Sequence, residues 1–221
     1  MRESAVQQRV LPGGCPLWLI DRPGAGILSA KLWMRGGSSS DPSGQRGAAQ
    51  LLAGVLSRGC GELSGDALAD LVEGCGAGLR CEAAEDGTLI SLKCASSDAE
   101  ALLPLLLLMV RRPWLVDDQI DLERQLNLQT LQRQKEDPFQ LAHDQLRHML
   151  YGDGPYGHDP LGVDGELAAL QTEQIGALVP DLGQNGALLV ACGDLDDELP
   201  QLLNPLLNQC PWTTAPPSPG A

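Results

Sequence analysis

The chain has 221 residues, of which 43% are hydrophobic, so it is long and apolar enough to bury a sizeable core. Its formal net charge of -14 disfavours nucleic acid and anionic lipid as partners, because an acidic surface repels both. The longest strongly apolar run, residues 102–110, contains Pro104 and is too short to cross a bilayer, and the polar N-terminus has no signal-peptide core. We expect a soluble, cytoplasmic protein.

The cysteines carry no metal-binding pattern. None forms a Cys-x-x-Cys pair, and none has a histidine at zinc-finger spacing, so no structural zinc site is expected. An odd number of cysteines in apolar surroundings indicates reduced, buried thiols. The seven are Cys15, Cys60, Cys75, Cys81, Cys94, Cys192 and Cys210.

The first elements in chain order read as strands. Residues 9–20 predict a hairpin around a Pro-Gly-Gly turn. Residues 27–34 predict a strand, because apolar side chains alternate along it. A loop of small residues, 36–44, then leads into a helix over residues 46–57 that stops near Gly59.

A second helix and a hairpin follow. Ser64 is a suitable N-cap for a helix over residues 65–73. Strands over residues 79–83 and 88–95 are joined by a tight turn at Glu85-Asp86-Gly87.

The second half is mainly helical. The pattern predicts three successive helices, over residues 98–111, 117–135 and 138–150, and then a loop over residues 152–165. It further predicts a helix over residues 172–182, a strand over residues 187–192 and a last helix over residues 198–209. This order predicts the α+β class, with an antiparallel or mixed sheet covered by helices. We expect one domain over residues 1–210 and a proline-rich linker over residues 211–221.

Several segments together resemble one known family. Gly36-Gly37-Ser38, the segment Gly44–Gly59, and Glu73-Gly74-Cys75-Gly76-Ala77 fall in its order. So do Arg112-Pro113-Trp114 with Glu123-Arg124, the loop YGDGPYGHDPLG at 151–162, and Ala191-Cys192-Gly193-Asp194-Leu195. The chain resembles the N-terminal half of the M16 metallopeptidases, the pitrilysin, insulinase and mitochondrial processing peptidase group. The resemblance implies the family's α/β roll, of which this chain would be one homologous half.

The resemblance also implies that the metal centre is absent. In the family, His-x-x-Glu-His on a helix and a distal Glu hold Zn²⁺ and activate water. The matching positions here are Gln50, Ala53, Gly54 and Thr130. Amide and hydroxyl groups are poor zinc ligands, and alanine and glycine offer no side-chain donor, so we expect neither catalytic residues nor zinc. Glu123 survives, either as a remnant or as a surface residue paired with Arg124 or another neighbour.

No other catalytic or metal site is indicated. His143 and His148 lie five residues apart on a predicted helix and do not share a face, while His158 lies in a loop. The tryptophans Trp18, Trp33, Trp114 and Trp212 are interpreted as packing anchors rather than ligand stackers.

Family members bind extended peptides at a sheet edge, which needs main-chain groups more than side chains. The matching residues here are Arg80, Cys81, Glu82 and Ala83, and the favoured alternative is that they form an ordinary strand of the sheet. Because M16 proteins are built from homologous halves, we expect a second M16-like half or an active M16 homologue as partner, in a homo- or heterodimer. A domain covered by such a partner should expose apolar surface.

The family resemblance and the missing zinc ligands lead to three hypotheses for the function. The leading hypothesis is a non-catalytic M16 homologue that acts as the structural or substrate-chamber subunit of an active zinc peptidase. The alternative is a stand-alone peptide- or protein-binding module. The third, ranked last, is a zinc endopeptidase with atypical ligands.

Overall fold

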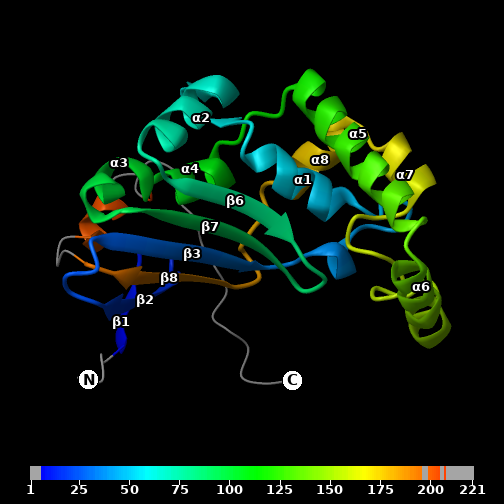
Figure 1. The fold of residues 1–221 in the computed structure, drawn as a ribbon, viewed down its shortest axis with the longest axis horizontal. Helices are drawn as coiled ribbons and strands as arrows, with labels where there is room; N and C mark the ends of the chain where they lie inside the picture. Colours follow the sequence, from blue (N-terminus) through cyan, green and yellow to red (C-terminus); the bar gives the residue numbers. More distant parts are fainter. Residues whose placement is uncertain (1–5, 196–198, 205–206, 208–221) are drawn as a thin grey trace.

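The fold rests on a six-stranded mixed sheet in the order β1-β2-β8-β3-β7-β6, with helices against one of its faces (Figure 1). The computed structural model describes residues 6–195, 199–204 and 207. The α+β class expected from the sequence is confirmed, and the sheet is mixed because β2 and β8 run parallel while the other neighbours are antiparallel.

Strands from both ends of the chain meet in this sheet. The first three are β1 (Val6–Val10), β2 (Pro16–Asp21) and β3 (Ile27–Arg35). A hairpin adds β6 (Gly78–Ala83) and β7 (Gly87–Ala95), and β8 (Ala187–Gly193) enters last, between β2 and β3. A separate two-stranded hairpin, β4 (Gly59–Cys60) and β5 (Leu63–Ser64), joins α1 to α2.

The helices lie between the strands in chain order. Those of the first half are α1 (Ala48–Leu56), α2 (Gly65–Gly74), α3 (Ala99–Leu102) and α4 (Leu105–Arg111). Those of the second half are α5 (Asp117–Gln134), α6 (Pro138–Tyr151), α7 (Asp164–Ala169) and α8 (Thr172–Leu178). Short 3₁₀ turns cover Ser38–Ser40, Ser96–Asp98 and Leu199–Leu202.

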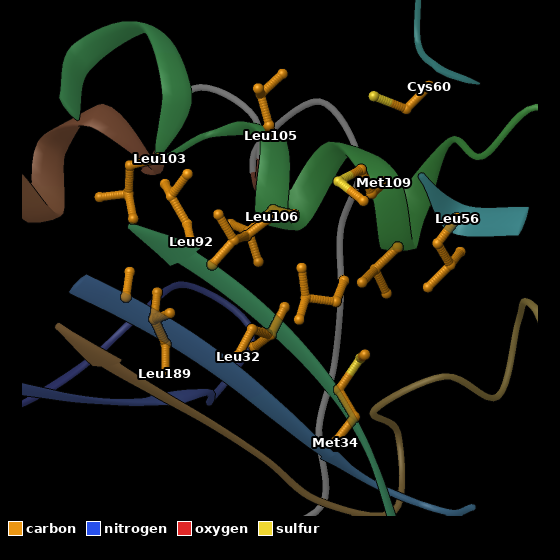
Figure 2. Packing of buried hydrophobic residues seen from close by; sticks show 14 of the residues in the cluster. Leu32, Met34, Leu56, Cys60, Leu92, Leu103, Leu105, Leu106, Met109 and Leu189 are labelled. Atoms are coloured by element: carbon orange, nitrogen blue, oxygen red, sulfur yellow. The ribbon is translucent and has the colours of Figure 1, made fainter. Parts of the chain in front are cut away.

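The core lies between the sheet and the helices. Leu28, Ala30, Leu32 and Met34 alternate along β3 and are all completely buried, as the sequence pattern predicted. Leu106 and Met109 of α4 face Leu32, Leu92 and Met34 across this interface (Figure 2). Removing this apolar area from water is the main favourable term in folding, at roughly 25 cal/mol per Å².

Some predicted boundaries were wrong. The helix expected over 98–111 is split into a 3₁₀ turn, α3 and α4, with the break at Leu103 and Pro104, because proline at position 104 cannot donate a main-chain hydrogen bond. The loop expected over 152–165 runs into α7, a helix that the sequence reading missed. The β4–β5 hairpin was also missed, because two-residue strands carry no periodic signal.

Other predictions were partly right. The helix expected over 172–182 ends at Leu178, and within the expected helix 198–209 the described part begins as the 3₁₀ turn Leu199–Leu202. The linker at 211–221, Cys210 and Trp212 lie outside the described residues. The other six cysteines are free thiols; three are buried and Cys75, Cys81 and Cys192 are half-buried. Among the described helices, none has the length and apolarity needed to span a bilayer.

Candidate functional site

The start of α1 is fixed by Asp41, which lies outside the helix. Its two carboxylate oxygens accept hydrogen bonds from Gly47 N at 2.7 Å and Ala49 N at 2.8 Å, and so satisfy donors that the first helical turn leaves unpaired. Burial raises the pKa of the Asp41 carboxyl group above its ordinary value, although these hydrogen bonds act in the opposite direction. Gly47 has a φ of 110°, and the helix therefore begins at Ala48, two residues later than predicted.

The first two positions matched to the zinc motif, Gln50 and Ala53, hold residues with other roles. Gln50 is half-buried, and its Oε1 accepts a hydrogen bond from Ala83 N of β6 at 2.9 Å. This bond ties α1 to the outermost strand of the sheet. Ala53 is completely buried and is part of the apolar core face of α1. The position that would supply a general base therefore carries a methyl group.

The third position, Gly54, lies directly against Glu123 of α5. A Cβ atom built on Gly54 would be 2.3 Å from Glu123 Oε1 and 2.5 Å from its Cδ, so a larger residue at this position would require the Glu123 side chain to move. Glu123 Oε2 accepts a hydrogen bond from Arg58 Nη2 at 2.9 Å. Arg58 lies two residues beyond the end of α1, in the turn that leads to β4, so the end of α1 and the residues after it contact the Glu123 side chain on both its oxygens.

This ion pair corrects the expectation for Glu123. Its side chain is only 13% exposed, so it is not a surface residue, and its partner is Arg58 rather than Arg124. Arg124 instead pairs with Asp121 and donates a hydrogen bond to the carbonyl oxygen of Leu170 at 2.8 Å.

Thr130, which the family resemblance matches to the distal ligand, is exposed on α5. Its hydroxyl group donates a hydrogen bond to the carbonyl oxygen of Leu126 at 2.9 Å, a local contact within the helix. On the same helix Asn127 is 5% exposed, and its Nδ2 has no hydrogen-bond partner among the described residues. The sequence reading did not single out Asn127, because a lone asparagine in a polar helix gives no signal.

The residues at these four positions do not fit a zinc ion. The side-chain oxygen of Gln50 accepts a hydrogen bond from Ala83 N, Ala53 and Gly54 have no side-chain donor, and the Glu123 carboxylate beside Gly54 is engaged by Arg58. Over residues 6–195, 199–204 and 207, no group of three or more His, Cys, Asp or Glu residues is arranged to hold a metal ion.

The histidines are not brought together either. His143 stacks on Phe139 of the same helix, with ring centroids 6.3 Å apart. His158 is buried, and its Nδ1 lies 2.8 Å from the carbonyl oxygen of Asp159. It lines a polar pocket of about 490 Å³ at the start of α1 that also includes Asp41, Arg46 and Glu166. Arg46 is hydrogen-bonded to Glu166 through both its main chain and its guanidinium group.

The residues suggested for peptide binding lie in β6, at the edge of the sheet. Ala84 N donates to Gly87 O within the β6–β7 hairpin, whereas Ala83 N points to the other side and donates to Gln50. Because main-chain direction alternates in an antiparallel pair, the main-chain groups of Cys81 also point away from β7. Burial raises the pKa of the Cys81 thiol to about 12. Arg80 and Glu82 form a salt bridge at 3.0 Å.

Known proteins resemble this chain over most of its length. The family model for insulinase (peptidase family M16) matches residues 18–162. An uncharacterized zinc protease of Streptomyces coelicolor is 22% identical over 172 residues, which is 78% of this chain and 38% of that protein. The chain thus spans less than two fifths of the length of this curated relative.

Solved structures share the fold. The crystal structure of a peptidase M16 inactive domain from Pseudomonas fluorescens superposes with a TM-score of 0.87 and 23% identity, over 98% of this chain and 53% of that one. A protease from Helicobacter pylori superposes with a TM-score of 0.83 and 16% identity, over 98% and 52% of the two chains. At such identities the likeness establishes the fold alone.

Proposed function

The chain belongs to the M16 (insulinase) peptidase family, and from this premise we propose that it is a non-catalytic member that has lost the zinc site. In this proposal it serves as the structural or substrate-chamber counterpart of an active M16 zinc peptidase. Its own residues contribute surface and shape, and the partner supplies the metal and the general base.

One observation carries the proposal, namely the contact between Gly54 and Glu123. A histidine at position 54 would collide with the Glu123 carboxyl group, which lies 2.3 Å from the Cβ position and is held by Arg58. The ligand position is thus both without a donor and filled by a neighbouring ion pair. The contact between Gly54 and Glu123 packs α1 against α5 without a metal ion. It therefore supports a role in which the fold is retained for reasons other than metal binding.

The first test is metal content. The protein, purified without chelators, should contain almost no zinc by elemental analysis, while an active M16 peptidase prepared in parallel should contain one ion per site. Stoichiometric zinc in this protein would contradict the proposal and support a zinc endopeptidase with atypical ligands.

The second test is reconstitution. The purified full-length protein is mixed with candidate active M16 homologues, and cleavage of a fluorogenic peptide is followed. Activity should exceed that of the homologue alone, and replacing the Glu of the homologue's His-x-x-Glu-His motif should abolish it. A lack of stimulation with every active homologue would rule out the partner role.

A stand-alone peptide-binding module is the second candidate, favoured by the position of β6. This strand is outermost in the sheet, and the main-chain groups of Cys81 point away from β7, the direction from which an extended peptide would pair. Titration of the protein alone with a library of extended peptides tests it. Saturable binding without an M16 partner would favour this candidate over the first.

A further inference from the structure

The polar pocket of about 490 Å³ at the start of α1 is lined by side chains that the protein's own contacts leave partly unpaired. We call it the Asp41–His158 pocket. Its lining comes from three parts of the chain, which are residues 38–46, residues 153–158 and Glu166. A pocket of this volume is within the range that holds a small organic ligand.

Main-chain hydrogen bonds hold the walls of the Asp41–His158 pocket in place. Ser38 N donates to Ala84 O at 3.0 Å, which ties the first wall to the β6–β7 turn. Val163 N donates to Arg46 O at 3.2 Å, which ties the chain after the second wall to the start of α1. Because the pocket is formed in the folded chain, little conformational entropy is lost when a ligand enters it.

Ser38 contributes a buried hydroxyl group to this pocket. The residue is 1% exposed, and its Oγ has no hydrogen-bond partner among the described residues. An unpaired hydroxyl group away from water destabilises the folded state, so a ligand that hydrogen-bonds to Ser38 Oγ would remove that cost.

His158 contributes an acceptor nitrogen. The residue is 8% exposed, and its Nδ1 lies 2.8 Å from the carbonyl oxygen of Asp159. A carbonyl oxygen only accepts hydrogen bonds, so Nδ1 carries the proton and Nε2 of the neutral ring has an unshared lone pair. No described residue donates a hydrogen bond to Nε2.

The charged residues of the lining favour a cation. Asp41, Asp153 and Glu166 supply three carboxylates, against the single guanidinium group of Arg46. That guanidinium group is hydrogen-bonded to Glu166 and lies 3.9 Å from Asp153, so it is not free to receive an anionic ligand. Asp41 forms no ion pair with a described residue, and burial raises the pKa of its carboxyl group. Asp41 is therefore the carboxylate that a bound cation would neutralise.

The donor set of the pocket suits an organic cation rather than a metal ion. Over residues 6–195, 199–204 and 207, no group of three or more His, Cys, Asp or Glu residues is arranged to hold a metal. A primary ammonium group has three N–H donors and no acceptor. It therefore matches three acceptors, which are the oxygens of Ser38 and Asp41 and the Nε2 atom of His158.

We propose that the Asp41–His158 pocket binds the primary ammonium group of a small organic amine or of a lysine side chain. Asp41 is the counter-ion, and Ser38 and His158 accept hydrogen bonds from the ammonium group. This inference goes beyond the proposed function and does not depend on it. None of the three residues is matched to the zinc motif, and the pocket is complete within this chain.

An NMR titration of the full-length protein tests the assignment. One probe is putrescine, a small diamine, and the other is Nα-acetyl-lysine-N-methylamide, which carries the same ammonium group on a peptide-like unit. The control probe is a butanediol of the same chain length as putrescine, which can donate hydrogen bonds but has no charge. The main-chain amide signals of Gly44 and Gly154, which line the pocket, report binding.

Two substitutions remove one contact each and should leave the fold intact. Ser38→Ala deletes a hydroxyl group that bonds no described residue, and Asp41→Asn keeps a side chain that can cap α1. Ser96→Ala is the matched control. Ser96 Oγ is likewise buried and unpaired, but it lies in the 3₁₀ turn Ser96–Asp98, outside the lining of the pocket.

We expect saturable shifts with at least one of the two amines and none with the butanediol. Ser38→Ala should raise the Kd about tenfold, because it removes a hydrogen bond to a charged group, and Ser96→Ala should leave it unchanged. Asp41→Asn should raise it further. Saturation with putrescine alone would identify a free amine as the ligand, and saturation with the lysine probe alone would identify a polypeptide. No saturation with either amine, equal shifts with the butanediol, or an unchanged Kd in Asp41→Asn would overturn the proposal.

Discussion

The Glu123 carboxyl group occupies the space that any side chain at Gly54 would need, with its Oε1 2.3 Å from the position of a Cβ atom. Arg58, in the turn that follows α1, donates a hydrogen bond to the other oxygen of that carboxyl group, Oε2, at 2.9 Å. Glu123 of α5 thus contacts both Gly54 and Arg58, and the energetic coupling of these contacts can be measured.

Gly54→Ala should lower the free energy of unfolding by about 1–3 kcal/mol, because an added methyl group forces the Glu123 side chain or the α1–α5 contact to move. Gly74→Ala is the matched control, since a Cβ atom there meets nothing within 4 Å. The control should be neutral or slightly stabilising, because alanine favours the helix. Equal effects of the two substitutions in urea unfolding would contradict the Gly54–Glu123 contact.

The Arg58–Glu123 ion pair should show a coupling of about 1–2 kcal/mol in a double-mutant cycle with Arg58→Met and Glu123→Gln. The side chains are 33% and 13% exposed, and Arg58 Nε has no other partner among the described residues, so losing Glu123 leaves a poorly solvated cation. Arg112 and Glu62, at 47% and 90% exposure, form the comparison pair and should couple by less than about 0.5 kcal/mol. Similar couplings for both pairs would argue that Glu123 is solvated.

Gln50→Ala should accelerate hydrogen exchange of the Ala83 amide about fivefold, because a typical hydrogen bond contributes about 1 kcal/mol. The Ala84 amide, bonded to Gly87 O inside the hairpin, is the internal control and should keep its exchange rate. Heteronuclear NMR measures both amides in one sample. An unchanged Ala83 rate would mean that Gln50 does not bind this edge.

Glu166→Gln should reduce the loss of stability on acidification. The hydrogen bonds from Arg46 lower the pKa of the Glu166 carboxyl group below 4.5, so its contribution is complete above that pH and is lost as the pH falls through the folded-state pKa. Asp41 acts in the opposite sense, because burial raises its pKa and stability is lost as the pH rises from 3.8 towards the raised value. Urea titrations between pH 7 and pH 3 measure the free energy of unfolding at each pH. If Glu166→Gln loses as much stability on acidification as the unsubstituted protein, the Arg46–Glu166 interaction is not the cause of that loss.

The Cys81 thiol should resist alkylation in the folded protein. Burial raises its pKa to about 12, so at pH 8 only about one thiol in ten thousand is ionised, and the thiolate is the reactive form. Iodoacetamide labelling followed by mass spectrometry, with the urea-unfolded protein as control, measures the rate. Labelling at the unfolded rate would show that the β6 edge opens freely.

Local patterns predicted much of the fold. The alternation in residues 27–34 identified β3 and its inward face, and Ser64 indeed accepts a hydrogen bond from Ala67 N as the N-cap of α2. The apolar residues on both sides of Pro104 predict one continuous helix, whereas the structure has α3 before this proline and α4 after it. The short elements β4, β5 and α7 escaped for lack of periodicity.

By itself, the sequence was sufficient to predict the α+β class, because the order of apolar patterns indicates the order of strands and helices. The assignment of Gln50, Ala53, Gly54 and Thr130 to the positions of a zinc motif remains a prediction from the family resemblance. Only the tertiary structure decided that Arg58 pairs with Glu123 across 65 positions, that β8 enters between β2 and β3, and that Trp18 and Trp33 share one groove. The physical reason is that periodicity reports which face of an element is apolar. It does not report which distant element meets that face, because packing between elements sets that choice.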